Sequence, residues 1–218
     1  MSDPVDRLEL YADYVCPFCY LGKRSLDRYR GSREEPLAVD WQPFDLRRGK
    51  RTADGSIDHD VDDGKDEAYF QQARENVRRL QAEYDVEMAQ ELAIEVDSLP
   101  AQQASWYVSQ EYPDRWDAFD EAIYDALWQD GRDVGDGDVL IALAEDVDLP
   151  TDEIRSAIDD DGLRAELEDR FAAAQQRGIT GVPTFVHDGR AARGAVPPAH
   201  LERLLEGTDG ESNSETHR

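Results

Sequence analysis

Cysteine is nearly absent from this 218-residue chain, which has only Cys16 and Cys19, in the stretch YVCPFCY. A chain of this length can bury a hydrophobic core without a crosslink. A disulfide across two intervening residues would also restrict the unfolded chain very little, because the loop that it closes is short. The close spacing therefore indicates a reactive pair, which is either half of a zinc site or a dithiol that cycles between reduced and oxidised forms.

Long apolar runs are absent as well. No stretch approaches the roughly 20 apolar residues of a membrane-spanning helix. The first residues, MSDPVDRLELYADYV, lack a basic segment followed by an apolar one, so we expect no signal peptide. These absences predict a cytoplasmic protein that has no membrane partner.

Lysine is scarce, and positive charge is far outnumbered. The lysines are Lys23, Lys50 and Lys65, and 24 basic residues face 50 acidic ones, which gives a net charge of −26. Four tryptophans, nine tyrosines and a clear apolar periodicity argue against a disordered acidic chain. The composition resembles that of proteins from extreme halophiles, whose surfaces are acidic throughout. Such a charge argues against nucleic acid as a partner.

The order of the expected elements indicates an α/β fold. Two strands flank a helix that begins at the cysteines, a strongly helical block follows, and a final helix, hairpin and helix close the chain. The expected strands cover 7–12, 37–44, 184–187 and 191–194, and the expected helices include 66–84, 100–111, 115–128, 138–146, 151–159, 162–177 and 198–206.

The position of the cysteines predicts their roles. Pro17 favours the first turn of a helix, and a thiol at a helix N-terminus has a lowered pKa because the helix dipole favours its thiolate. We therefore expect Cys16 to be the more exposed, more acidic and attacking sulfur. Cys19, one turn later, would resolve the mixed disulfide.

The sequence resembles the DsbA family of thiol–disulfide oxidoreductases. Within that family it is similar to the FrnE-like branch, also called 2-hydroxychromene-2-carboxylate isomerase-like. The resemblance covers nearly the whole chain and rests on these motifs: the strand ending in Asp13, CPFCYLG from Cys16, WQPF from Trp41, Asp97-Ser98 with Ala101 and Ala104, the helical insertion, and GITGVPTF from Gly178.

The resemblance implies a thioredoxin-like fold with an inserted all-helical domain over the dithiol. The corresponding division is a thioredoxin-like domain over 1–62 and 166–206, the helical domain over 63–165, and a disordered tail over 207–218.

The resemblance also implies that Pro183 is a cis-proline facing the dithiol. Pro17, Phe18, Val182 and Pro183 would contact the substrate, with the Val182 backbone pairing with an extended peptide. Branch members usually have Trp at the position of Phe18, and periplasmic relatives have His. Phe18 cannot donate a hydrogen bond or a charge to Cys16, so we do not expect the extreme acidity of the His-containing type.

The favoured function is thiol–disulfide oxidoreductase or isomerase, acting on protein or small-molecule thiols and disulfides. We expect no metal and no cofactor besides the redox-active Cys16–Cys19 disulfide, because the histidines lack zinc-site spacing. One alternative is a glutathione-type isomerase or transferase with a small aromatic or polyketide-like substrate. Such isomerases use a serine in place of the first cysteine. A non-catalytic chaperone or binding module is another alternative, and the sequence leaves open whether the protein forms a homodimer.

The charge of −26 predicts that folding depends on salt. Repulsion between like charges reaches over about 10 Å at 0.1 M salt but only about 3 Å at 1 M. Self-repulsion of the chain therefore falls steeply with added salt. We expect the unfolding temperature, measured by circular dichroism, to rise markedly between 0.1 M and multimolar KCl. Equal unfolding temperatures would contradict the halophile interpretation.

Overall fold

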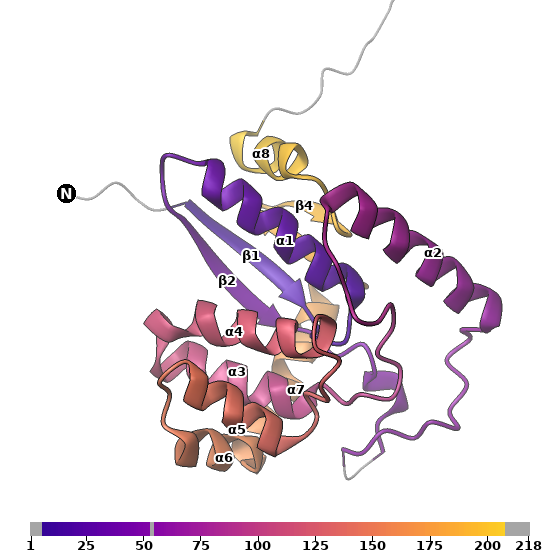
Figure 1. Ribbon diagram of the computed structural model, residues 1–218, viewed down its shortest axis with the longest axis vertical. Coiled ribbons are helices and arrows are strands. Elements are labelled where there is room, and N and C mark those ends of the chain that lie inside the picture. Colours follow the sequence, from indigo (N-terminus) through magenta and orange to yellow (C-terminus); the bar gives the residue numbers. More distant parts are fainter. Residues whose placement is uncertain (1–5, 53–54, 208–218) are drawn as a thin grey trace, which may run out of the picture.

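The computed structural model describes residues 6–52 and 55–207 and confirms the predicted α/β fold (Figure 1). The elements, in chain order, are β1 (Asp6–Ala12), α1 (Pro17–Ser32), β2 (Leu37–Pro43), the short 3₁₀ helix η1 (Arg48–Lys50), α2 (Glu67–Tyr84), α3 (Leu99–Glu111), α4 (Pro113–Trp128), α5 (Gly137–Asp146), α6 (Thr151–Ile158), α7 (Asp161–Gln176), β3 (Thr184–His187), β4 (Arg190–Arg193) and α8 (Pro198–Glu206).

The strands form one sheet in the order β2-β1-β3-β4. β1 pairs in parallel with β2 and antiparallel with β3, which pairs antiparallel with β4. Side chains alternate between the two faces of a strand. Phe185 therefore faces α1, where its ring lies 3.4 Å from the position of a Cβ on Gly22. Tyr11 packs with Ala174 of α7 on the opposite face.

The last two strands form the hairpin that the Asp188-Gly189 pair predicts. Both residues have positive φ, 47° and 75°, as the tight turn between two twisted strands requires. Gly178, with φ 79°, follows the C-cap of α7, a position at which helices commonly have a glycine in the left-handed conformation. These two turns place the segment between α7 and β3 directly beside the start of α1.

The helices between β2 and β3 do not form a single block. Helices α3 to α6 pack on one another and reach α7 and α1. Helix α2 packs instead along α1, where its buried side chains Val77, Leu80 and Tyr84 form a cluster with Leu21. Figure 1 shows α2 beside α1, apart from the lower group of helices. The predicted inserted domain over 63–165 therefore includes a helix that packs on the dithiol-bearing helix.

The predicted boundary between 165 and 166 falls inside α7. That helix begins at Asp161, after the Asp160 carboxylate accepts a hydrogen bond from the backbone N–H of Leu163 (2.9 Å). A continuous helix with a satisfied N-cap does not divide there. The predicted disordered tail lies outside the described residues, apart from Gly207, which ends α8 with a φ of 72°.

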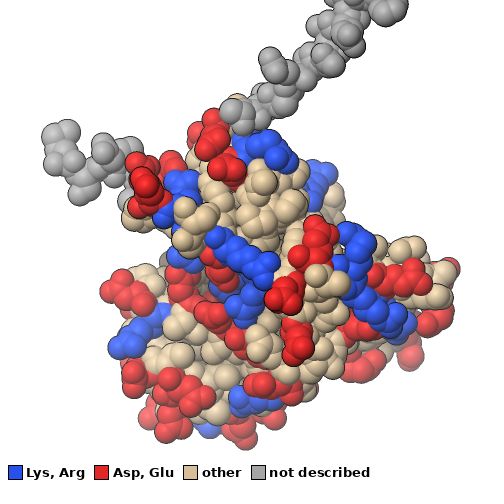
Figure 2. Space-filling view, turned by 45° about the horizontal axis from the view of Figure 1, so that its top comes forward, with Lys and Arg blue, Asp and Glu red and all other residues tan. Residues whose placement is uncertain are grey.

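Charged side chains of both signs are scattered over the face seen in Figure 2, where the red acidic groups alternate with blue basic groups and tan uncharged areas. Many of the arginines pair with these carboxylates. Within the described ranges, no helix combines the length and the apolar character needed to cross a membrane.

One ion pair between α1 and α4 is buried. Lys23 Nζ lies 3.3 Å from Asp120 Oδ2, and the two side chains are only 8% and 4% exposed. The other oxygen of Asp120 accepts a hydrogen bond from the Tyr14 hydroxyl (2.8 Å), which in turn lies 2.6 Å from the Ser105 hydroxyl. This network links the turn before the dithiol to both α3 and α4.

Lys23→Met should destabilise the protein by about 3 kcal/mol or more, because it leaves the Asp120 charge buried without its partner. The matched control is Arg30→Met. Arg30 joins the same two helices through Asp117 (2.9 Å), but the side chains of that pair are 31% and 53% exposed. Solvent screening limits the loss of stability in Arg30→Met to about 1 kcal/mol or less. Urea unfolding of the three proteins in high salt measures both losses, and equal losses would contradict the assigned role of the buried pair.

Candidate active site

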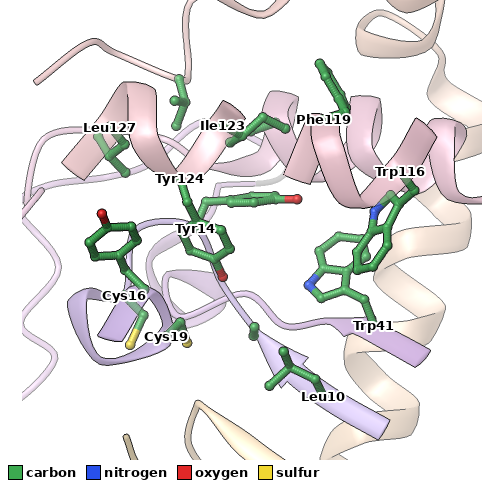
Figure 3. Close-up of a cluster of buried hydrophobic side chains, with 14 of the residues drawn as sticks. Leu10, Tyr14, Cys16, Cys19, Trp41, Trp116, Phe119, Ile123, Tyr124 and Leu127 are labelled. Atoms are coloured by element: carbon green, nitrogen blue, oxygen red, sulfur yellow. The ribbon is translucent and has the colours of Figure 1, made fainter. Parts of the chain in front are cut away.

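The two cysteines lie where β1 turns into α1, with their sulfur atoms close together (Figure 3). Cys16 is the N-cap of α1, with extended backbone angles (φ −91°, ψ 112°), and Pro17 begins the helix. The Cys16 carbonyl accepts hydrogen bonds from the backbone N–H groups of Cys19 (3.0 Å) and Tyr20 (3.3 Å). The dithiol therefore lies at the helix end that carries partial positive charge, as the sequence predicts.

The expected difference in exposure between the two thiols is wrong. Cys16 is 3% exposed and Cys19 is 2% exposed, and both are free thiols. Cys16 is covered because the segment before β3 crosses over it, with its Sγ 3.6 Å from the carbonyl oxygen of Val182. Burial raises the pKa of Cys19 well above its usual value, and the adjacent Cys16 raises it further.

The two cysteines differ instead in what they face. A pocket of about 520 Å³ opens beside the dithiol and is lined by Cys16, Pro17, Phe18 and Val182. Cys19 and Pro183 do not belong to its lining. Further walls come from the loop after β2, η1, the first half of α2 and residues 92–94. Cys16 is therefore the sulfur that a molecule in this pocket meets.

The Val182–Pro183 peptide bond is cis. The Pro183 ring packs against α1, since a Cβ added to Gly22 would lie only 3.1 Å from its Cγ. The Pro183 carbonyl accepts a hydrogen bond from the backbone N–H of Gly194 (2.8 Å), which ties it to the end of the hairpin. A glycine at position 22 is what allows α1 to approach this segment.

A buried carboxylate, that of Asp13, lies three residues before Cys16 in the chain. Asp13 is fully buried, and its Oδ1 accepts hydrogen bonds from Ser98 Oγ (2.5 Å), Gln102 Nε2 (3.3 Å) and the backbone N–H of Val15 (3.3 Å). Its Oδ2 accepts from the backbone N–H of Leu46 (2.8 Å). Burial, with a contribution from the neighbouring Asp45, raises the pKa of Asp13 to about 6 despite these donors.

Comparison with known proteins identifies the family. Residues 7–206 match the DSBA-like thioredoxin domain. The chain belongs to this family. The match spans both the dithiol turn and the segment before β3, and it confirms the predicted thioredoxin-like fold.

Two relatives of this DSBA-like chain each share 26% sequence identity with it. YwbO of Bacillus subtilis (strain 168) aligns over 207 residues, 91% of this chain and 94% of the relative. The 2-hydroxychromene-2-carboxylate isomerase of Sphingobium xenophagum aligns over 189 residues, 83% of this chain and 89% of the relative.

Solved structures show the same fold. A probable DsbA oxidoreductase from Streptomyces coelicolor superposes with a TM-score of 0.73 at 22% identity, covering 98% of this chain and 94% of that one. The cytosolic disulfide reductase DsbM from Pseudomonas aeruginosa, with GSH, gives a TM-score of 0.63 at 18% identity, covering 92% and 98%.

The pocket of this DSBA-like protein also has a basic wall that the sequence analysis did not predict. Arg47, Arg48 and Lys50 come from the loop after β2 and η1, and Lys65 precedes α2. The guanidinium of Arg47 donates to the carbonyl oxygens of residues 93 and 94, which holds that segment against the pocket. The available signal was the run RRGK, which begins three residues after a predicted strand in a chain with three lysines.

Within residues 6–52 and 55–207, no three His, Cys, Asp or Glu side chains are placed to hold a metal ion. His187 contacts the backbone carbonyl of Arg7 through its Nδ1 (3.0 Å), and His59 lies near Glu95. Neither histidine lines the dithiol pocket.

Asp13→Asn should change how stability depends on pH. The pKa of Asp13 is about 6 when folded, against 3.8 as the ordinary value. Its folded pKa is raised, so this contribution favours folding fully below about pH 4 and is lost as the pH rises through 6. A difference of about two pKa units corresponds to about 3 kcal/mol. The stability of the wild type relative to the variant should fall by about that amount between pH 4 and pH 7 in urea unfolding.

Asp97→Asn is the control of opposite sign. Despite partial burial, hydrogen bonds from Arg51 and from the backbone of Leu99 lower the pKa of Asp97. The stability of the wild type relative to this variant should therefore rise with pH up to the unfolded pKa of about 4 and stay constant above it. Parallel pH profiles for the wild type and Asp13→Asn would contradict the assignment.

Proposed function

We propose that this protein is a thiol–disulfide oxidoreductase in which Cys16 attacks and Cys19 resolves. The observation that carries the proposal is the asymmetry of the pair. Cys16 lines the pocket at the N-terminus of α1, while Cys19 lies outside the lining, one helical turn away. A thiol with a raised pKa is a poor first nucleophile at neutral pH, which suits Cys19 to the second step.

The reaction needs only the dithiol and a substrate disulfide. The Cys16 thiolate attacks one sulfur, a mixed disulfide forms, and the other substrate sulfur leaves as a thiolate that takes up a proton. Cys19 then loses its proton and attacks Cys16, which releases the second substrate thiol. Two electrons pass from the dithiol to the substrate, and the reverse sequence oxidises a substrate dithiol. No cofactor besides the Cys16–Cys19 disulfide enters this scheme.

Pro17, Phe18, Val182 and Pro183 would position the substrate. Pro17 and Phe18 form the pocket wall next to Cys16, and the Val182 backbone crosses over the sulfur. An extended substrate would pair with that backbone, as peptides do at open strand edges. Pro183 would keep the adjoining segment free of a competing ladder because it has no N–H to donate.

We place the activity in the cytoplasm. The chain has only two cysteines in 218 residues, and the structural neighbour DsbM is named a cytosolic disulfide reductase. Membership of the FrnE-like branch is part of the same proposal. The reduction potential of the dithiol would determine whether the protein oxidises or reduces its substrates.

A glutathione-type isomerase is the second candidate, because one relative at 26% identity is a 2-hydroxychromene-2-carboxylate isomerase. The presence of both cysteines argues against it, since that chemistry does not use a resolving thiol. An isomerase would survive Cys19→Ala, whereas disulfide exchange would stop at the mixed disulfide.

Cys19→Ala should accumulate a mixed disulfide through Cys16 when the reduced protein meets a peptide disulfide. Non-reducing gels and intact mass measure the adduct, and brief iodoacetamide labelling should modify Cys16 first in the wild type. Cys16→Ser is the matched control and should form no adduct. If adducts formed on Cys19 in the Cys16→Ser variant as fast as adducts form in the wild type, the roles of the two cysteines would have to be exchanged.

A further inference from the structure

The charge around the dithiol pocket is opposite in sign to the charge of the protein. The chain carries 50 acidic and 24 basic residues, yet the charged side chains that line the pocket are mostly basic: Asp45, Arg47, Arg48, Lys50, Asp63 and Lys65. Lys50 and Lys65 are two of only three lysines in the chain. Because the surrounding field repels anions, a local positive wall is needed wherever an anion is to be held.

The basic groups of this wall are only partly neutralised. Lys50 and Lys65 share one carboxylate, with their Nζ atoms 3.4 Å and 3.1 Å from Asp63 Oδ2. That trio therefore keeps a net positive charge. Lys65 also lies over the Tyr69 ring, 5.8 Å from its centre, which directs the ammonium toward the pocket side of α2.

Among the described residues, Arg48 has a terminal guanidinium nitrogen without a hydrogen-bond partner. It lines the pocket from the start of η1, and its Nη1 atom is buried without a hydrogen-bond acceptor among the described residues. A buried donor without an acceptor is unfavourable, and more so when the group is charged. Arg47 differs in that both of its Nη atoms already donate to backbone carbonyls, and its Nε alone lacks an acceptor among the described residues. Arg48 therefore has an unused donor, which a rotation of its side chain would present to an acceptor in the pocket.

The same pocket collects exposed apolar side chains. Of the four large apolar residues that are exposed in the described chain, three line this pocket: Leu46 (37%), Tyr69 (52%) and Ile94 (37%). A purely polar small thiol would leave this apolar surface uncovered. A polypeptide segment with apolar and acidic side chains near its cysteine would use both surfaces.

We propose that Arg48, supported by Lys50 and Lys65, binds a carboxylate side chain of the substrate polypeptide next to the sulfur that Cys16 attacks. The proposal rests on the disulfide-exchange function. It makes acidic polypeptides the preferred substrate class, with the carboxylate held by the Arg48 fork and the neighbouring apolar side chain against Leu46, Tyr69 and Ile94.

The test is single-turnover exchange in multimolar KCl. The reduced protein is mixed with disulfide-linked peptides that differ only after the cysteine, where they have Glu, Gln or Lys, and the released thiol is followed by chromatography. The Glu peptide should react about tenfold faster than the Gln peptide, the effect of one charged hydrogen bond. Long-range attraction is screened at this salt concentration, so a preference that persists there reports direct contact.

Arg48→Gln should remove the preference for the Glu peptide and leave the Lys peptide unaffected, while Arg48→Lys should keep part of it. Arg155→Gln is the matched control, because Arg155 is an exposed α6 residue outside the pocket and pairs with Asp138. Thermal unfolding checks that each variant is folded.

Equal rates for the three peptides with the wild type, or an equal loss for all three with Arg48→Gln, would overturn the proposal. The small disulfide 3,3′-dithiodipropionate has carboxylates but no peptide backbone, so it tests whether the carboxylate must belong to a polypeptide. Arg48 dependence for that compound alone would overturn the choice of a polypeptide. Absence of exchange with every probe would instead contradict the disulfide-exchange function itself.

Discussion

The carboxylate of Asp13 is the contact on which the geometry around the dithiol depends. It accepts hydrogen bonds from three separate parts of the chain: the turn that leads to Cys16, the loop after β2, and the start of α3. The loop after β2 carries Arg48, and α3 belongs to the helices packed beside the sheet. One buried side chain therefore positions Cys16, the basic wall of the adjacent pocket and the helical layer relative to one another.

The parts of the site that are local in sequence were predictable. Cys16 and Cys19 lie at a helix start because Pro17 and the preceding strand specify that start within a few residues. The Asp188-Gly189 turn is equally local, since only residues that tolerate positive φ form it. The strands and most helices follow from apolar periodicity, and their order then leaves few topologies.

The parts that depend on distant contacts were not predictable in this way. Cys16 is covered because the carbonyl of Val182, far along the chain, lies against its sulfur. The role of Asp13 requires partners near residues 46, 98 and 102, and no spacing rule connects them. Helix α2 packs on α1 through an apolar face that the sequence alone assigns to no partner. The predicted boundary at 165/166 falls inside α7, because hydrophobic periodicity does not mark where one packed unit ends.

The distribution of lysine has a practical consequence for handling the protein. Lys23 is buried in its pair with Asp120, whereas Lys50 and Lys65 line the dithiol pocket. Among the side chains, amine-selective reagents therefore meet their accessible targets next to Cys16. Coupling through lysine to a dye, a resin or a sensor surface would attach the protein at its dithiol pocket, so a side chain outside the lining of that pocket is the better attachment point.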